Sequence, residues 1–296
     1  PIIILFNSLI ISIIVLFLKI DIVHARSRAP AWSCWISCFL TRKKFVTTFH
    51  GTYGFSNKIK KFYNSIMLRS SLIIAGSNFI FQHINENYST FLNPKNKLMV
   101  IFRGINLDYF NKKNISQKKL EKLILEWKVD ENKYKILLPG RLTSWKGQEV
   151  FIEALNILIE DYKQNNFEAI ILGSDQGRNV YSKKLLSLVD RYQLNKKVKF
   201  INHCKEMPLA YSLSNIIVSS SIKPEAFGRV AVEAQAMEKV IVASNVGGSK
   251  ETILKEKSGF LFKSGDPREL SRVLNTVLEL DKETLYLIGN EGRKNV

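Results

Sequence analysis

The feature that most constrains the fold is a regular alternation of short apolar runs with longer segments of helical apolar spacing, such as residues 147–162 and 180–192. Strands that alternate with helices form parallel sheets, so the sequence predicts an α/β fold rather than an all-α or all-β one. The expected strands are residues 21–24, 45–49, 72–75, 98–101, 135–138, 169–172, 198–201, 216–219, 240–243 and 259–262.

The chain has 296 residues, which is enough for two domains of this kind. Charge is dense and apolar content falls at residues 111–133, between the fourth and fifth expected strands. We therefore expect a first Rossmann-like domain at 1–125, with an incomplete sheet, and a second at 126–296 that is large enough to build its own core. Because the first residue is Pro1 rather than Met, we also expect the sequence to begin inside a longer reading frame.

The composition is that of a globular protein, with 46% hydrophobic and 24% charged residues, and it excludes disordered, collagen-like and coiled-coil chains. Basic residues outnumber acidic ones by 44 to 26, and the first 110 residues hold thirteen basic against three acidic side chains. A basic surface of this kind attracts phosphate groups on nucleotides, nucleic acids or anionic lipids.

Two apolar segments of the first domain leave alternatives open. Residues 2–18 are almost purely apolar, which favours a buried helix but also fits a membrane span. In residues 58–69, Lys58, Lys60 and Lys61 alternate with apolar side chains. This segment is either an amphipathic helix on an anionic membrane or a solvated helix face over a core.

The three cysteines are too few and too irregularly spaced for a disulfide framework or a metal site. Cys34 and Cys38 lie four residues apart without a partner pair, and Cys204 stands alone. Cysteines used in this way favour a reducing, cytoplasmic compartment.

The first of four polar clusters follows the expected strand 135–138, at the kind of strand-to-helix turn where open α/β sheets bind ligands. Residues 139–147 read PGRLTSWKG and place the cations Arg141 and Lys146 five residues apart in one loop. Two such cations beside a helix start are suited to a diphosphate, which they neutralise and bind through hydrogen bonds. As a bare pattern the cluster is also compatible with ordinary turn chemistry.

The second cluster, PEAFGRVAVEA at residues 224–234, follows the strand 216–219 and holds two carboxylates, Glu225 and Glu233. Glu225 stands in a loop and Glu233 just over two turns later on one helix, so both can face one ligand. Carboxylates accept hydrogen bonds from neighbouring sugar hydroxyls. The alternative is that one glutamate caps the helix and the other is paired internally.

The two remaining clusters also stand at strand ends. Residues 245–251 (NVGGSKE) form a glycine-rich turn whose backbone amides are available to an anion, and residues 45–51 (FVTTFHG) place His50 at a strand tip. His24 has the same position after its own strand, and for both histidines structural and functional roles remain open. We interpret His83 and His203 as structural.

Taken together, the motifs GRLTSWKG, ILGSDQG, PEAFGRVAVEA, NVGGSKET and SGFLF resemble, in this order, those of glycosyltransferase family 4, which has the GT-B fold. The most specific of them is PEAFGRVAVEA, which is similar to the family's Glu-(seven residues)-Glu motif. HARSRAPAWS and TTFHGTYG resemble in particular bacterial members that build surface polysaccharide or lipopolysaccharide. The resemblance covers nearly the whole chain and implies two Rossmann-like domains whose parallel sheets face each other across a cleft.

The resemblance also implies roles for individual residues. Arg141 and Lys146 would bind the diphosphate of a nucleotide-sugar and stabilise it as it leaves, Glu225 would hold the hydroxyls of the transferred sugar, and His50 would line the sugar and acceptor side. These four are the implied catalytic residues. The implied donor-binding residues are Arg141, Lys146, Glu225, Phe227, Gly228 and Glu233, with Glu233 on the ribose and the backbone at Phe227 and Gly228 on the sugar and phosphate.

The expected activity is a retaining, metal-independent transfer of a sugar to a lipid-linked or polysaccharide acceptor of the cell envelope, with the nucleotide-sugar as co-substrate and no further cofactor. We expect the enzyme in the cytoplasm, on the inner face of the cytoplasmic membrane, which its basic N-terminal domain would contact. The alternative is a non-catalytic, truncated remnant that still binds nucleotide-sugar. A nucleotide-sugar epimerase would need acid/base carboxylates that we cannot place, and no recognition motif supports a nucleic-acid partner.

Three departures from the family pattern bear on these expectations. The family's first strand and its glycine-rich loop are absent, and the sequence ends before the family's last helices. Glu238 and Val240 stand where a glycine and a proline are usual. We therefore expect an intact donor half and a damaged acceptor half.

Overall fold

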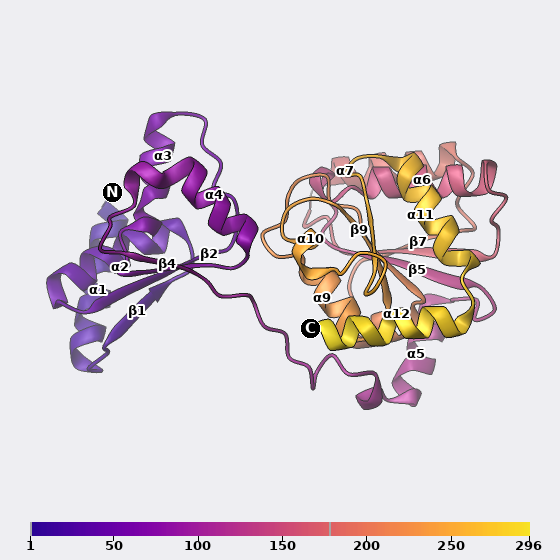
Figure 1. Ribbon diagram of the computed structural model, residues 1–296, viewed down its shortest axis with the longest axis horizontal. Coiled ribbons are helices and arrows are strands. Elements are labelled where there is room, and N and C mark those ends of the chain that lie inside the picture. Colours follow the sequence, from indigo (N-terminus) through magenta and orange to yellow (C-terminus); the bar gives the residue numbers. More distant parts are fainter. Residues whose placement is uncertain (1, 178) are drawn as a thin grey trace. The chain divides into compact units, whose positions relative to one another are not determined.

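The computed structural model describes residues 2–177 and 179–296, and all ten expected strands are present in it. The chain divides into two compact units, of which the first ends at Arg103 and the second runs from Gly104 to Val296 (Figure 1). Each unit contains a parallel sheet with helices against it, which confirms the α/β fold with two Rossmann-like domains.

The first unit contains a four-stranded sheet in the order β1-β2-β3-β4, in which every pairing is parallel. The buried side chains of Phe49, Ile73 and Ile84 form part of its core. Its elements are α1 (Ile2–Phe17), β1 (Ile22–Ala25), α2 (Arg28–Thr41), β2 (Lys44–Phe49), α3 (Lys58–Asn64), the 3-10 turn η1 (Ser65–Leu68), β3 (Leu72–Ala75), α4 (Asn78–Tyr88), η2 (Ser89–Phe91) and β4 (Lys97–Val100).

The expectation that residues 2–18 form a buried helix is half wrong. They do form the helix α1, but within this unit its buried residues are Ser8, Ser12 and Val15, and its large apolar side chains are exposed. Small side chains let α1 and α2 approach closely: the Ser12 hydroxyl donates to Ser37 Oγ at 3.1 Å. Apolar content alone therefore did not reveal which face packs. Among the described residues, no helix is long and apolar enough to cross a membrane.

Residues 58–69 are not one amphipathic helix. The helix α3 ends at Asn64, and a 3-10 turn continues to Leu68. Ile66, Met67 and Leu68 of the turn are fully buried, whereas Ile59 on the helix is 80% exposed. The two interpretations of this segment thus each describe a part of it: the helix carries an exposed face and the turn covers the core.

The second unit contains a six-stranded parallel sheet in the order β10-β9-β8-β5-β6-β7. Its elements are η3 (Lys112–Asn114), α5 (Gln117–Trp127), β5 (Tyr134–Pro139), η4 (Ser144–Lys146), α6 (Gln148–Glu160), β6 (Phe167–Leu172), α7 (Asn179–Arg191), β7 (Val198–Ile201), α8 (Met207–Leu213), β8 (Ile216–Ser219), α9 (Arg229–Ala236), β9 (Val240–Ser244), α10 (Ser249–Thr252), β10 (Phe260–Phe262), α11 (Pro267–Glu279) and α12 (Lys282–Asn295).

Helices cover both faces of this sheet (Figure 1). Side chains of a strand point alternately to the two faces. In β5, Ile136 and Leu138 pack with α6, α7 and α11, whereas Leu137 packs with α5, α8 and α9. A strand that is buried on both faces reads as a continuous apolar run, which is why these strands could be recognised in the sequence.

The structure divides the chain earlier than the boundary expected after residue 125, between Arg103 and Gly104. The intervening segment belongs to the core of the second unit. Phe110, Leu123 and Trp127 are buried there, and Leu123 and Trp127 come from α5. A few buried apolar side chains are enough to pack this charged segment onto the second unit. The low average apolar content of the segment did not indicate them.

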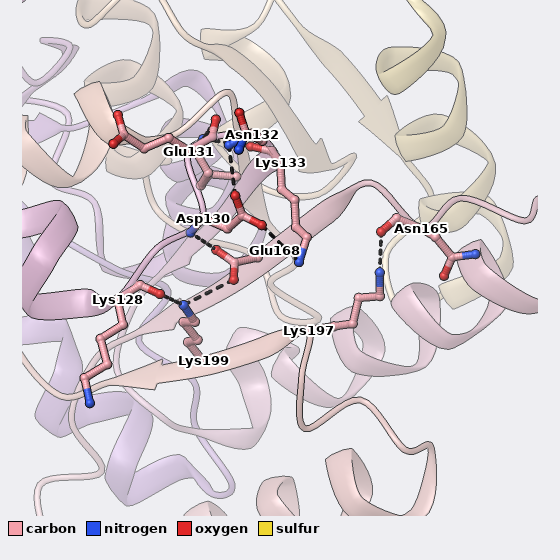
Figure 2. Close-up of polar contacts among 10 residues, drawn as sticks. Lys128, Asp130, Glu131, Asn132, Lys133, Asn165, Glu168, Lys197 and Lys199 are labelled. Atoms are coloured by element: carbon pink, nitrogen blue, oxygen red, sulfur yellow. Dashed lines mark hydrogen bonds and ion pairs between the residues drawn. The ribbon is translucent and has the colours of Figure 1, made fainter.

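A network of polar contacts holds the amino ends of β5, β6 and β7 together (Figure 2). The buried carboxylate of Glu168 accepts a hydrogen bond from the backbone amide of Asp130 at 3.0 Å and pairs with Lys199 at 3.2 Å. Asp130 pairs with Lys133 at 3.3 Å. The loop that enters β5 is therefore fixed by a carboxylate of the neighbouring strand.

Candidate active site

The candidate active site lies where the strand order of the second sheet reverses. From β5 the chain continues to β6 and β7 on one side, whereas β8, β9 and β10 lie on the other side. At such a switch point, the loops after two neighbouring strands diverge and leave a crevice at the carboxyl ends of the strands. Here they are the loop after β5, which carries Arg141 and Lys146, and the loop after β8, which carries Glu225.

The two loops are joined by an ion pair. Lys146 Nζ lies 2.7 Å from Glu225 Oε1, and both side chains are largely buried, with 14% and 12% exposed. The Ser221 hydroxyl donates to the same carboxylate oxygen. Lys146 also lies over the Trp145 ring, 4.6 Å from its centroid. The structure thus brings together two residues that are 79 positions apart in the sequence.

Glycine is needed where the first loop passes close to the second. Gly147 has φ +72°, and a Cβ there would lie 1.9 Å from the Ser220 carbonyl oxygen. The Ser220 hydroxyl in turn donates to the Gly147 carbonyl at 2.9 Å. Only a residue without a side chain permits this approach, which holds Lys146 next to its partner.

The glycine-rich turn after β9 holds Glu225 from another side. The Gly248 amide donates to the Glu225 carbonyl oxygen at 2.7 Å, and a Cβ at Gly247 would lie 2.5 Å from that same oxygen. This turn was expected to offer backbone amides to an anion. In the structure, one of these amides instead fixes the backbone of a carboxylate.

Glu233 lies on α9 with both carboxylate oxygens engaged. Arg229 Nη2 donates to Oε1 at 3.0 Å, and the Tyr211 hydroxyl donates to Oε2 at 2.8 Å. Burial, together with the Glu233 charge, raises the pKa of Tyr211 well above its usual value, so its proton stays on the hydroxyl. Sequence reasoning missed Tyr211, because it lies 22 residues away on an ordinary-looking helix.

A pocket of about 370 Å³ opens beside this carboxylate. It is lined from several strand ends, and its lining includes Arg141, Glu233, Tyr211, Arg229, Asn202 and His203. Arg141 is exposed, and the amide of buried Gln148 donates to its carbonyl oxygen at 2.9 Å. His203, which we interpreted as structural, therefore stands at a pocket wall.

The remaining predicted residues of the second unit lie at the start of α9. Phe227 is buried, and Gly228, with φ +82°, immediately precedes the helix. A Cβ at Gly228 would lie 2.8 Å from the Ser249 hydroxyl oxygen. The backbone of the second cluster is thus held tightly between α9 and the turn after β9.

His50 belongs to the first unit, directly after β2. Its Nε2 accepts a hydrogen bond from Arg26 Nε at 2.7 Å, which assigns the ring proton of a neutral imidazole to Nδ1. Nδ1 is buried and has no hydrogen-bond partner among the described residues. Burial, followed by the charges of Arg103 and Arg26, lowers the pKa of His50 to about 4, so His50 is neutral at physiological pH.

The other strand-end histidine, His24, is paired within the sheet of the first unit. Its Nε2 lies 2.7 Å from Thr48 Oγ1. Burial and the Arg26 charge lower the pKa of His24 as well. His83 contacts Asn87 one helical turn later at 3.2 Å, in agreement with the structural interpretation.

The molecule has two parallel α/β units, the second doubly wound with charged loops at its switch point, and its fold matches solved structures of the two-domain GT-B type. The family model for "Glycosyl transferases group 1" matches residues 120–295, and the model for "Glycosyltransferase Family 4" matches residues 2–109. The chain therefore belongs to the group 1 glycosyltransferases, which transfer sugars from nucleotide-sugar donors.

Individual relatives agree with this assignment. A glycosyltransferase from Rickettsia africae is 38% identical with a TM-score of 0.90, over 100% of this chain and 76% of that one. Anabaena Alr3699/HepE, solved in complex with UDP, is 25% identical with a TM-score of 0.83, over 97% of this chain and 76% of that one. The capsular polysaccharide biosynthesis glycosyltransferase CapM of Staphylococcus aureus is 27% identical over 206 residues, which are 69% of this chain and 52% of CapM.

Proposed function

We propose that this protein transfers a sugar from a nucleotide-sugar to a lipid-linked or polysaccharide acceptor of the cell envelope, with retention of anomeric configuration. The observation that carries the proposal is the pairing of Lys146 with Glu225 at the switch point, beside a pocket lined by Arg141 and Glu233. The solved relative from Anabaena holds UDP, which supports a nucleotide donor, and the name of CapM supports a surface polysaccharide product.

In this proposal the cations act on the diphosphate. As the bond between the anomeric carbon and the phosphate oxygen breaks, its electron pair leaves with the diphosphate, and Arg141 and Lys146 offset the growing negative charge. These two cations would supply the charge that a divalent ion would otherwise provide, and we therefore propose that the reaction needs no metal and no further cofactor. The acceptor oxygen bonds to the anomeric carbon on the same face and passes its proton to the departing diphosphate oxygen.

Carboxylates hold the neutral parts of the donor. Glu225 would accept hydrogen bonds from the hydroxyls of the transferred sugar, while its link to Lys146 keeps its carboxylate oriented. Glu233 would accept from the ribose, in exchange for part of its contact with Arg229. The backbone at Phe227 and Gly228 would contact sugar and phosphate, and neutral His50 would line the sugar and acceptor side.

A thermal-shift screen against UDP, GDP, ADP and CMP sugars tests donor binding. A ligand that binds only the folded protein raises its melting temperature. One nucleotide class is expected to stabilise the chain, and Lys146→Ala and Glu233→Ala are expected to abolish the shift, whereas the exposed Lys183→Ala keeps it. A folded chain that responds to none of the donors would contradict the proposal.

A transfer assay with the stabilising donor then separates the enzyme from the alternative of a non-catalytic remnant. We expect transfer in the presence of EDTA and a product with the anomeric configuration of the donor, which proton coupling constants report. Donor binding without transfer to any glycan or lipid-linked acceptor would favour the remnant. An inverted product, or a reaction that stops with EDTA, would contradict retention or metal independence.

We further propose that the protein works in the cytoplasm against an anionic membrane surface, through its basic first unit. The exposed face of α3 supports this proposal. Ile59 is 80% and Phe62 48% exposed, and the exposed Lys58 and Lys60 alternate with them. Apolar side chains among lysines are suited to the interface of an anionic bilayer.

Vesicle cosedimentation tests the membrane proposal. Binding to vesicles with anionic lipid should exceed binding to neutral vesicles, and the double substitution Ile59→Ser with Phe62→Ser should weaken it. Lys95→Gln, which removes an exposed charge of the same unit elsewhere, serves as the control. Equal binding by the double variant and the unaltered chain would contradict docking through α3.

A further inference from the structure

A second cavity lies at the amino ends of the strands of the six-stranded sheet, where β5, β8 and β9 begin. Its volume is about 440 Å³, and its charged lining residues are Lys133, Lys135, Lys239, Lys282, Glu131 and Glu238. Four lysines thus face two glutamates. The volume is that of a site for a small molecule, and the candidate active site includes none of these residues.

Two of the lysines are held inside by the backbone. Lys135 is 7% exposed, and its Nζ donates to the carbonyl oxygens of Glu131 at 3.0 Å and Lys133 at 2.7 Å. Lys239 Nζ donates to the Ser212 carbonyl oxygen at 2.9 Å. Over residues 2–177 and 179–296, no carboxylate lies within ion-pair distance of either ammonium group. Ammonium groups removed from water without a counter-charge are costly.

One of the two glutamates that line the cavity, Glu238, already has a cationic partner. Glu238 pairs with Lys112, whose ammonium group also lies over the Tyr286 ring, 5.1 Å from its centroid. On the other side of the cavity, Glu168 fixes the loop that carries Glu131 and Lys133, as Figure 2 shows. The rim is therefore formed before any ligand arrives, and its positive charge stays in excess.

The two inner lysines differ in their electrostatic surroundings, and cationic neighbours lower the pKa of Lys239 alone. Burial, and after it the charge of Lys112, lowers the pKa of Lys239 to about 8; Glu238 raises this pKa, and Lys135 lowers it. Burial also lowers the pKa of Lys135, against the opposing charges of Glu168, Glu131 and Asp130. An anion between the two ammonium groups would offset the repulsion between their positive charges.

We propose that this cavity binds a small anion that carries a phosphate group, held by Lys135, Lys239 and Lys282. The two negative charges of a phosphate dianion match the positive charges of the two ammonium groups. Its oxygens would accept hydrogen bonds from those N–H groups of Lys135 and Lys239 that do not bond to backbone carbonyls. Lys282 is exposed at the start of α12 and lines the same cavity. Inorganic phosphate and the phosphate monoester of a sugar share this chemistry.

Site-specific protection from acetylation tests the proposal on the intact chain. Lys239 is labelled with acetic anhydride at rising inorganic phosphate, with ionic strength held constant by sodium chloride, and peptides are quantified by mass spectrometry. At a phosphate concentration ten times the dissociation constant, mass action predicts about tenfold protection of Lys239. The peptide with Lys146 reports phosphate in the candidate active site in the same sample, so the two sites are read independently. Unchanged labelling of Lys239, or equal protection of exposed Lys183, would overturn the proposal.

Variants locate the anion. Lys282→Gln lies on the surface and should leave the fold intact, yet weaken the protection of Lys239 several-fold, whereas Lys183→Gln should not. Protection that is as strong in Lys282→Gln as in the unaltered chain would overturn the assignment of Lys282. A second titration with glucose 6-phosphate separates the two sources. Tighter protection than by inorganic phosphate indicates that the cavity also holds a sugar moiety, and weaker protection indicates a site for free phosphate.

The pH dependence of phosphate affinity gives an independent check. Above pH 8 Lys239 loses its proton in the empty cavity, so the affinity should fall by up to about tenfold per pH unit. The other titratable groups that face it are Lys112, Lys135, Glu238, Glu131, Lys133, Lys282 and Tyr286. An affinity that is constant from pH 7 to 9.5 would overturn the role of Lys239.

Discussion

The two units follow the same architectural rule but differ in how completely they bury their apolar surface. In the second unit every residue of β6, β8 and β9 is buried. In the first unit β4 has no fully buried residue, and α1 exposes large side chains such as Ile3, Phe6 and Ile13. Because burial of apolar area is the main favourable term in folding, we infer that the second unit is the more self-sufficient of the two.

The largest expected effect is therefore a difference between the separated units. We expect residues 104–296 to unfold in a single cooperative transition as a monomer. We expect residues 2–103 to self-associate and to bind the dye ANS, because their apolar surface remains open. Size-exclusion chromatography and urea titration measure both properties. A monomeric, cooperative first unit that binds no dye would refute this comparison.

Next in size is the effect of filling the close approach between the loops after β5 and β8. Gly147→Ala would place a Cβ 1.9 Å from the Ser220 carbonyl oxygen at φ +72°, and should cost about 3 kcal/mol or more of unfolding free energy. Gly265→Ala is the matched control, because its φ is +75° but nothing lies within 4 Å of the added atom. Urea titration of both variants separates the clash from the backbone strain. Equal losses in the two would show that the contact with Ser220 is not tight.

Third is the charge at the switch point. Lys146→Met keeps much of the side-chain volume but removes the ammonium group that faces Glu225, and loss of such a stabilising group lowers kcat by about 10²–10³. The exposed Lys183→Met is the control for loss of one positive charge. Initial rates with the donor identified by thermal shift measure the effect. A kcat within twofold of the unaltered chain would remove Lys146 from the proposed mechanism.

The strands could be predicted from the sequence because a parallel strand buried on both faces is apolar at every position. Ile216, Ile217 and Val218 are an example, and all three are fully buried. The loops that follow such strands could be predicted for the same reason, which placed Lys146 and Glu225 at one sheet edge. Their direct contact spans 79 residues, and no local pattern encodes it.

Other features could not be predicted because they depend on contacts between residues that are far apart in the sequence. The burial of α1 was misjudged because apolar content does not say which face packs, and small serines rather than large side chains meet α2. Tyr211 was missed because its role exists only through Glu233 on another helix. The lysine cavity was missed because Lys135 and Lys239 lie at the starts of two separate strands, β5 and β9.

A smaller effect is expected from the support of Glu233. Tyr211→Phe removes one hydrogen bond to its carboxylate, which is worth about 1 kcal/mol, or roughly five- to tenfold in donor affinity. The effect should appear in KM for the donor rather than in kcat, because Glu233 would bind the ribose and not the reacting atoms. Tyr192→Phe is the control. Unchanged KM would mean that Arg229 alone holds the carboxylate.

The last prediction concerns the response of the first unit to acid. In the folded chain the pKa of His50 is about 4, below the ordinary value of about 6.5 expected when unfolded, so between these values the unfolded state binds more protons. The stabilising contribution is present above pH 6.5 and is lost as the pH falls toward 4. We expect His50→Gln to flatten the pH dependence of the urea midpoint over this range. His24→Gln should act in the same direction, because burial also lowers the pKa of His24. If both variants keep the slope of the unaltered chain, acid sensitivity does not arise from these strand ends, and the polar edge of the first sheet is less desolvated than its hydrogen bonds indicate.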